Sequence, residues 1–311
     1  MHNKTTVRIL RLLKTGCICA AVALPGWAYS AGTEVRSIAN DAPSLSSDSV
    51  MVVDLDSSQV LYAKNADVKR PIASITKLMT AMVTLDAGLP MGEKIRITES
   101  DIDTLRNSHS RLRVGTVHTR RELLQLALMS SENRASSALA RSYPKGSRAF
   151  YAAMNAKAAL LGMQNTRFVD ATGLNSENTS TAEELVNLVS ASLAYPQIRE
   201  ITTTESYEVR QKSVLKYRNS NPLVRNDSWE IGLSKTGYII PAGHCVAMQA
   251  RIADRPLVIV LLDAAGRSAI VSDSNRIKGW IEKVAATNAL AVQGQKNLAA
   301  TYTTLALHEI F

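Results

Sequence analysis

Three short motifs, standing in one order along the chain, carry the chemistry that this sequence can perform. They are an S-x-x-K, an S-x-N and a K-T-G motif, and they occupy residues Ser74–Lys77, Ser131–Asn133 and Lys235–Gly237. Together they supply two serine hydroxyls, two lysines, a threonine hydroxyl and an amide. Acyl transfer through a serine ester uses this set of groups when no histidine serves as the base. The motifs therefore predict an acyl-transfer site.

Each motif is short, and further copies occur in the chain. A second K-T-G at residues 14–16 falls in a segment that we expect to be cleaved off. The S-x-x-K match at Ser142 contains Pro144, which opposes a helical pairing of the serine with the lysine. Another match at Ser213 lies in a stretch of strand or loop character, and a second S-x-N at Ser176 lies in a loop rich in Gly, Asn and Ser. Only the set at Ser74, Ser131 and Lys235 has the three motifs in order, each in a segment of suitable predicted structure.

Ser74 and Lys77 are expected on the first turn of a helix. There the unpaired N–H groups and the positive end of the helix dipole favour an oxyanion. Lys77 lies three residues on, so it shares a face with Ser74. Burial lowers the pKa of a lysine and lets it act as a base toward the serine. Taken alone, the pair fits an N-terminal serine and a surface lysine of an ordinary helix better than a site, but the apolar neighbours of Lys77 oppose that interpretation.

The other two motifs are expected on a bend and on a strand. Ser131 and Asn133 lie between two helices, where the hydroxyl can relay a proton to a leaving amine and the amide can hold the substrate backbone. Lys235 and Thr236 lie on a strand, and a lysine beside a hydroxyl can bind a carboxylate. Gly237 has no side chain, so an extended peptide can pair along that strand.

Apolar periodicity and capping signals indicate the elements that position these residues. Strands are expected over residues 51–55, 59–62, 231–240, 245–252 and 257–262. Helices are expected over residues 74–87, 119–129, 133–141, 147–161, 181–193 and 272–286. Strands at both ends therefore flank a helical middle. The predicted fold class is α+β, with one five-stranded antiparallel sheet, flanking helices and a helical insert.

The ends of the chain differ in composition from its body. Residues 1–30 have the basic start, uncharged apolar run and small-x-small cleavage site of a secretory signal peptide. The apolar run is too short to remain as a membrane span. Residues 31–47 are expected to be a flexible lead-in, residues 48–287 the catalytic domain, and residues 288–311 a tail of helix or disorder.

Charge and residue types restrict the partners and cofactors. The formal net charge of +9 falls to about +5 without the four basic residues of the signal, which suits a polyanionic wall, a membrane surface or a soluble basic protein. No nucleic-acid partner is expected, because the basic residues are scattered and aromatic residues make up only 5%. No zinc-binding histidine spacing or phosphate-binding glycine loop occurs, so no metal or other cofactor is predicted. Cys245 is expected to be a buried, inert thiol, and His109 to lie in a surface loop.

The motifs resemble those of the penicillin-binding protein and serine β-lactamase superfamily. Four stretches resemble its low-molecular-mass D-alanyl-D-alanine carboxypeptidase family: VVDL at 52–55, RPIASITKLMT at 70–80, DATGL at 170–174 and SKTGY at 234–238. Two more resemble the endopeptidase branch, the penicillin-binding protein 7 type: SHSRLRVGT at 108–116 and MSSENRA at 129–135. The resemblance covers about residues 48–287.

This resemblance implies a DD-peptidase fold like that of serine β-lactamases. It also implies a periplasmic enzyme that acts on the stem peptides and cross-links of peptidoglycan. Ser74 would attack a D-Ala carbonyl and form an acyl-enzyme, with Lys77 as the base and Ser131 carrying the proton onward.

Substrate binding follows from the same resemblance. Lys235 and Thr236 would bind the terminal carboxylate of the substrate, or that of a β-lactam antibiotic acting as a covalent inhibitor. The backbone N–H groups of Ser74 and Tyr238 would form the oxyanion hole.

Two departures from the family favour its endopeptidase branch. Carboxypeptidases of the family carry a second, all-β domain after the catalytic one, and here some 25 residues follow the expected closing helix. The tail also lacks a basic amphipathic membrane anchor. A carboxypeptidase that removes the terminal D-Ala stays as the alternative, and peripheral association with the membrane or with wall enzymes stays open.

Two further functions are disfavoured. A β-lactamase would need a glutamate in an E-x-x-L-N context, which the loop before Lys235 does not offer. A non-catalytic penicillin-binding wall protein would not need Lys77, Ser131 and Lys235 together.

Overall fold

The computed structural model describes residues 42–211 and 213–308, with side chains as far as residue 290. The predicted signal peptide, the first part of the lead-in and most side chains of the predicted tail lie outside the described residues. None of the helices in the described part of the chain is both long and apolar enough to cross a membrane.

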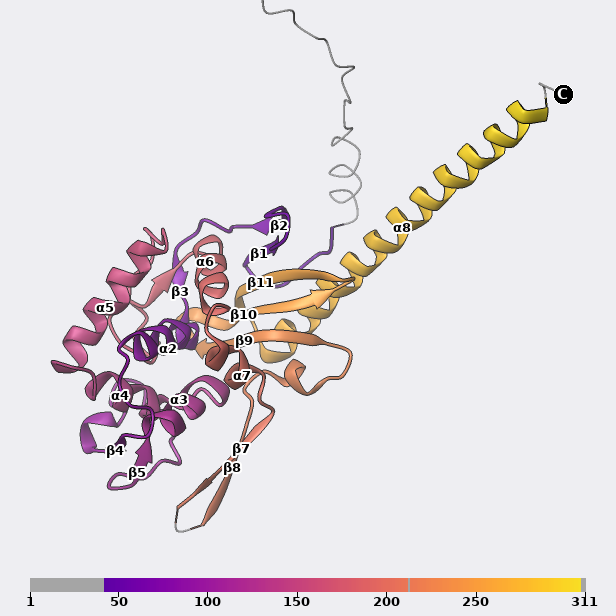
Figure 1. Ribbon diagram of the computed structural model, residues 1–311. Coiled ribbons are helices and arrows are strands. Elements are labelled where there is room, and N and C mark those ends of the chain that lie inside the picture. Colours follow the sequence, from indigo (N-terminus) through magenta and orange to yellow (C-terminus); the bar gives the residue numbers. More distant parts are fainter. Residues whose placement is uncertain (1–41, 212, 309–311) are drawn as a thin grey trace, which may run out of the picture.

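A five-stranded antiparallel sheet forms the centre of the fold (Figure 1). Its strands lie in the order β2-β1-β11-β10-β9. Their bounds are Val60–Lys64 for β2, Ser49–Asp54 for β1, Arg255–Ala264 for β11, Gly243–Ile252 for β10 and Glu230–Ile239 for β9. The predicted sheet is confirmed, with the expected two N-terminal and three C-terminal strands. Strand β9, which carries the K-T-G motif, lies at the edge.

The sheet separates two apolar layers, because successive side chains of a strand point to opposite faces. Val52, Met248 and Ile259 lie on one face and pack with Ile277 and Trp280 of helix α8 (Arg267–His308). Their neighbours Val53, Ala247 and Val260, among others, lie on the other face and join the larger core. Helix α8 begins before the predicted residue 272 and continues beyond the predicted residue 286, and Figure 1 shows it extending away from the sheet.

The larger core is a layer of helices around the buried helix α2. The bounds of these helices are Thr76–Asp86 for α2, Arg120–Met129 for α3, Asn133–Arg141 for α4, Gly146–Leu160 for α5, Ala182–Ser192 for α6 and Pro196–Thr203 for α7. Thr119 caps α3 and Thr181 caps α6, as the sequence predicted. Residues Thr76–Thr84 are all buried, so α2 is the central helix of this layer.

Short elements complete the fold, and the sequence did not predict most of them. The short helical turns are η1 (Ala73–Ile75), η2 (Glu99–Asp101), η3 (Pro222–Arg225) and η4 (Ile240–Ala242). The strand pairs are β3 (Arg70–Pro71) with β6 (Thr179–Ser180), β4 (Lys94–Arg96) with β5 (Val117–Thr119), and β7 (Ser206–Arg210) with β8 (Val214–Arg218). The β7–β8 hairpin projects from the body next to β4 and β5 in Figure 1.

Candidate active site

Ser74 lies in the η1 turn, two residues before helix α2 begins at Thr76. Its hydroxyl accepts a hydrogen bond from Lys77 Nζ at 2.8 Å and donates one to the backbone oxygen of Thr172 at 3.3 Å. Ala73 has a φ of +46°, a conformation that is uncommon for a residue with a side chain. The nucleophile predicted at the start of a helix therefore lies in a tight turn leading into that helix.

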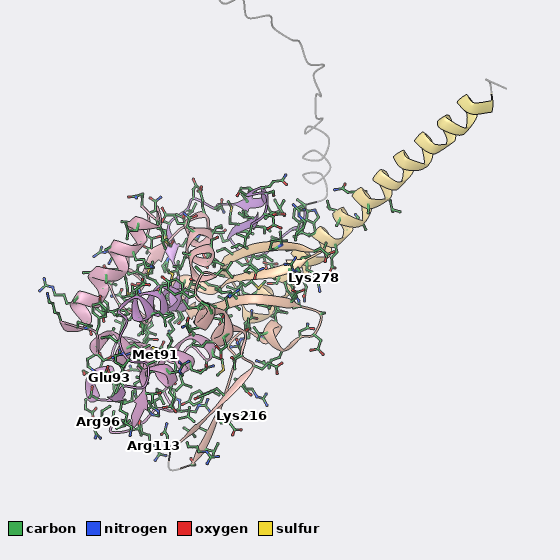
Figure 2. All side chains as sticks on the ribbon, viewed as in Figure 1. Met91, Glu93, Arg96, Arg113, Lys216 and Lys278 are labelled. Atoms are coloured by element: carbon green, nitrogen blue, oxygen red, sulfur yellow. The ribbon has the colours of Figure 1, made fainter. Side chains whose placement is uncertain are left out.

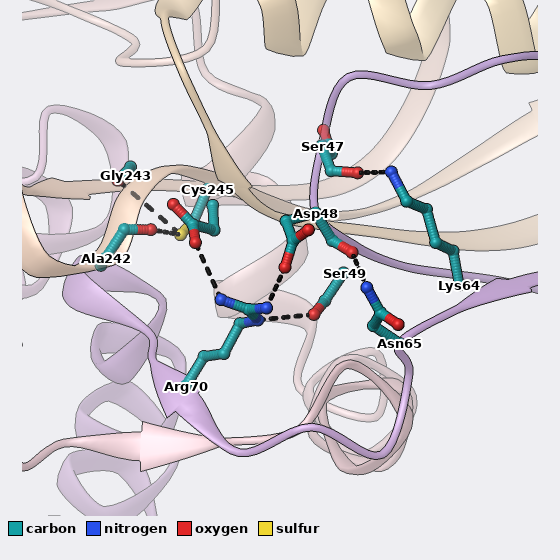
Figure 3. Close-up of polar contacts among 10 residues, drawn as sticks. Ser47, Asp48, Ser49, Lys64, Asn65, Arg70, Ala242, Gly243 and Cys245 are labelled. Carbon is teal, nitrogen blue, oxygen red and sulfur yellow. Dashed lines mark hydrogen bonds and ion pairs between the residues drawn. The ribbon is translucent and has the colours of Figure 1, made fainter.

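An ion-pair network holds the segment that leads into this turn. Arg70 of β3 forms ion pairs with Asp48 and with Asp263, and its distance to the Asp263 carboxylate is 2.8 Å (Figure 3). Its Nε also donates a hydrogen bond to Ser49 Oγ at 2.7 Å. These partners lie on or beside β1 and β11. The network therefore connects the nucleophile's segment to the central sheet. Cys245 lies nearby and is buried, as predicted, and burial raises its pKa to about 12.

Lys77 is fully buried behind Ser74. Besides Ser74, its ammonium donates to Asn133 Oδ1 at 2.8 Å and to the Thr172 carbonyl at 2.6 Å. Burial lowers the pKa of Lys77 to about 7, although the carboxylates of Asp170 and Glu132 oppose this effect. A neutral amine has one lone pair, which can accept the Ser74 proton. Lys77 can therefore serve as a base near neutral pH.

The carbonyl of Thr172 comes from a loop that Asp170 organises. One carboxylate oxygen of Asp170 accepts the N–H groups of Thr172 and Gly173, both at 2.6 Å. The other oxygen accepts the N–H of Asn175 at 2.8 Å. Gly173 has a φ of +80°, and a Cβ atom there would lie 1.9 Å from the backbone oxygen of Ala73. The loop can approach the nucleophile's turn because this residue is glycine.

Ser131 and Asn133 occupy the bend between α3 and α4, as predicted. Ser131 has a φ of +62°, and its hydroxyl accepts a hydrogen bond from Lys235 Nζ at 2.9 Å. Asn133 binds Lys77 through its oxygen and donates from Nδ2 to Ser108 Oγ at 2.9 Å. The second N–H of that amide stays available to a substrate. Ser108 is a part of the site that motif reasoning did not single out.

Lys235 is as buried as Lys77 and lies on the other side of Ser131. Its ammonium also donates to the Thr236 carbonyl at 2.7 Å. Burial, and to a lesser degree the charge of Lys77, lower the pKa of Lys235. The hydroxyls of Ser74 and Ser131 each contact a buried lysine, so protons can move along two adjacent Ser-Lys pairs.

The edge strand β9 runs beside the nucleophile. A Cβ atom at Gly237 would lie 2.9 Å from the backbone nitrogen of Ser74, so only glycine admits this approach. Thr236 Oγ1 donates to Ser220 Oγ at 2.7 Å. Tyr238 is 55% exposed and stacks on His244 with ring centroids 4.2 Å apart. Ser220 carries no motif, and its part in the site was not predicted.

These groups surround a cavity of about 320 Å³. All the site residues predicted from sequence line it, except Lys77 and Lys235, which are buried behind its wall. Arg267, at the start of α8, adds a cation that the sequence analysis did not identify. No group of three or more His, Cys, Asp or Glu side chains within residues 42–211 and 213–308 is arranged to hold a metal ion.

Comparison with known proteins identifies the family. Residues 36–266 match the peptidase S11 family, described as D-alanyl-D-alanine carboxypeptidase. The chain is 45% identical to the D-alanyl-D-alanine endopeptidase of Escherichia coli K12, over 83% of this chain and 85% of that one. It is 47% identical to the enzyme of the same name from Pseudomonas aeruginosa PAO1, over 76% of this chain and 78% of that one.

A solved structure shows the same fold. The Streptomyces K15 DD-transpeptidase superposes with a TM-score of 0.71 at 27% identity, over 76% of this chain and 97% of that one. The family match spans Ser74, both lysines and the cavity lining as far as Cys245. The chain therefore belongs to the S11 family of serine DD-peptidases.

Proposed function

We propose that the protein is a D-alanyl-D-alanine endopeptidase that hydrolyses the peptide cross-links of peptidoglycan through an acyl-enzyme on Ser74, and that penicillins acylate the same serine. The observation that carries this proposal is the fully buried Lys77, whose Nζ lies 2.8 Å from Ser74 Oγ and whose pKa is lowered to about 7. A base with a pKa near the working pH is the most effective one.

The reaction begins when Ser74 Oγ attacks the D-Ala carbonyl carbon and its proton passes to the neutral amine of Lys77. The N–H groups of Ser74 and Tyr238 stabilise the oxyanion that forms. The C–N bond then breaks, and the leaving amine takes a proton through Ser131, which Lys235 contacts at 2.9 Å. Water attacks the resulting ester, which releases the new carboxylate and restores the Ser74 hydroxyl.

Substrate binding uses the wall of the cavity. The Thr236 hydroxyl and the cation of Arg267, which both line the cavity, suit the carboxylate of a peptide or of a β-lactam. Lys235, predicted to bind the same carboxylate, lies buried behind the wall and contacts Ser131 instead. An extended peptide can pair with the edge of β9, and the amide of Asn133 can bind the peptide backbone. The absent side chain of Gly237 makes room for the turn that carries Ser74, not for the peptide as predicted.

The endopeptidase function is preferred to the carboxypeptidase alternative on similarity. The relatives named endopeptidase from E. coli and P. aeruginosa are 45% and 47% identical, whereas relatives named carboxypeptidase from Bacillus subtilis and Mycobacterium tuberculosis are 28% and 32% identical. Export to the periplasm belongs to the same proposal. It rests on the signal-like residues 1–30, and the net charge of about +5 that remains without their four basic residues suits association with an anionic wall or membrane surface.

A β-lactamase is disfavoured by the carboxylates near Ser74. Asp170 is occupied by the N–H groups of its own loop, and Glu177 is 61% exposed and paired with Arg167 at 3.4 Å. Neither is free to activate a deacylating water at the ester, so a slowly hydrolysed penicilloyl-enzyme is expected.

The test is to incubate the protein with purified cross-linked dimeric muropeptides and with pentapeptide monomers, and to identify the products by liquid chromatography and mass spectrometry. Conversion of dimers to monomers, absent in Ser74→Ala, is the expected result. Loss of only the terminal D-Ala from monomers, with dimers intact, would make the protein a carboxypeptidase. Penicillin labelling without turnover of either substrate would leave a non-catalytic wall protein.

A further inference from the structure

A second hollow, larger than the one at Ser74, lies between the loop of residues 109–118 and the β7–β8 hairpin. Its volume is about 660 Å³, roughly twice that of the active-site cavity. Figure 2 shows Arg113 and Lys216 on this side of the molecule, where the hairpin projects. We refer to this hollow as the hairpin groove. None of the catalytic steps described above uses it.

The hairpin groove is basic. The charged and titratable side chains among its described lining residues are His109, Arg111, Arg113, His118 and Arg210, and none of these lining residues is an aspartate or glutamate. The nearest carboxylate to His118 is that of Glu122, at 4.0 Å and outside this lining. Charges of one sign concentrated in a concave surface attract a ligand of the opposite sign. The groove therefore suits a ligand that carries carboxylates or other anions.

Specific side-chain contacts hold the two walls of the hairpin groove together. Arg111 joins its two walls, because its guanidinium donates to the Lys216 carbonyl at 2.9 Å and lies 3.8 Å above the ring of the buried Tyr217. Arg113 and Arg210 are exposed, and no ion pair with a carboxylate within residues 42–211 and 213–308 neutralises either of them. These two arginines are the cations most available to a ligand.

Both walls of the groove lead directly into the active site. His109 follows Ser108, whose hydroxyl accepts a hydrogen bond from Asn133 Nδ2 at 2.9 Å. Strand β8 leads to Ser220, whose hydroxyl accepts from Thr236 at 2.7 Å. A peptide bound at Ser74 can therefore continue into the hairpin groove.

We infer that the hairpin groove binds the carboxylates of the second stem peptide of a cross-linked dimer, and so selects cross-links over single stems. This inference rests on the proposed endopeptidase function. A stem peptide carries free carboxylates on its acidic residues, and a dimer presents a whole second stem beyond the scissile bond. A monomer that ends in D-Ala-D-Ala has nothing to place there. The second stem thus matches the groove in charge, and its absence from monomers explains the selectivity.

The experiment compares Arg113→Ala/Arg210→Ala with a control, Lys69→Ala/Arg148→Ala, which removes two exposed cations from other faces. Affinity for uncleaved dimers is measured calorimetrically in the Ser74→Ala background. Two exposed ion pairs contribute up to about 1 kcal/mol each, so dimer affinity should fall about tenfold in the groove variant and stay unchanged in the control. In the enzyme with Ser74 intact, kcat/KM for dimers should fall by the same factor, while the rate of penicillin acylation stays within about twofold.

Amidated dimers, in which the stem carboxylates are converted to amides, give a second readout. The unmodified enzyme should lose about tenfold more affinity for them than the groove variant does, because amidation of the carboxylate that binds at Thr236 weakens both proteins alike. Unchanged dimer affinity in the groove variant would overturn the inference. The inference would also be overturned if the groove variant lost binding to phosphatidylglycerol vesicles but kept its affinity for dimers, because that result would assign the groove to an anionic membrane. If the intact enzyme leaves dimers uncut but binds them through these arginines, the proposed function fails and the groove assignment stands.

Discussion

The rate at which penicillin acylates Ser74 is expected to depend on pH through Lys77. Protonation is the perturbation, because an ammonium has no lone pair with which to accept the Ser74 proton. Complete burial lowers the pKa of Lys77 from an ordinary value of 10.5 to about 7. The neutral amine therefore accumulates as the pH rises through 7, and acylation should accelerate with it.

The size of the effect follows from this pKa. Titration of one group with a pKa of about 7 makes about 3% of Lys77 neutral at pH 5.5 and about 97% neutral at pH 8.5. The second-order acylation rate should then rise about 30-fold between these two pH values and level off above pH 8. With an unshifted pKa of 10.5, only about 0.03% would be neutral at pH 7, and the rate would still rise tenfold per unit at pH 9.

The assay is stopped-flow or quenched labelling with a fluorescent penicillin, with circular dichroism at each pH to establish that the fold persists. His244 is the titratable imidazole that lines the cavity in the described part of the chain, and burial and the charge of Arg267 lower its pKa from the ordinary value of 6.5. His244→Gln is therefore the control, and its profile should keep the same midpoint. A rate that is flat from pH 5.5 to 8.5, a rate that still rises at pH 9, or a midpoint that disappears in His244→Gln would refute the assignment of Lys77 as the base.

Three further substitutions test the surroundings of the nucleophile. Gly173→Ala places a Cβ atom 1.9 Å from a backbone oxygen and should lower the free energy of unfolding by about 3 kcal/mol or more. The control is Gly88→Ala, where φ is +62° but the space is open, and there thermal unfolding should show a loss of about 1 kcal/mol. Equal losses in the two variants would contradict the steric argument. Asp170→Asn removes a charge that raises the pKa of Lys77, so the midpoint of the acylation profile should move to lower pH, and an upward shift would exclude this electrostatic effect. Ser131→Ala should slow acylation about 100-fold without lowering the melting temperature, and an unchanged rate would remove Ser131 from the proton pathway.

Sequence patterns predicted the central sheet and the helices that end in recognisable signals. Thr119 opens α3 with a capping box, and apolar residues at helical spacing identified α2. The β7–β8 hairpin was not predicted as a pair of strands, although Tyr207 and Val209 alternate with polar residues. Each strand has five residues and buries only one side chain, Val209 or Tyr217, so the pattern is too short to identify a strand.

The candidate site was predictable where motifs supply side chains and unpredictable where backbone or tertiary contacts supply the groups. The Thr172 carbonyl binds Lys77 at 2.6 Å, yet a backbone oxygen is present in every residue and leaves no trace in residue types. Ser108 begins the stretch SHSRLRVGT and Ser220 belongs to none of the quoted stretches; neither was predicted as a site residue, because only packing brings them to Asn133 and Thr236. The burial of Lys235 also could not be foreseen from a strand that lies at the edge of the sheet.

The pairing of β1 with β11 has a consequence for the order of folding. Ser49 pairs with Leu262 and Asp54 with Leu257, so one of the first strands of the domain needs the last one as its neighbour. Contacts of such high sequence separation form late, since the loop between them must be closed first. The sheet cannot be completed until about residue 264 has left the ribosome. The growing chain therefore lacks its complete central sheet until more than four fifths of its residues have been synthesised, and β1 has no partner on one side during that time.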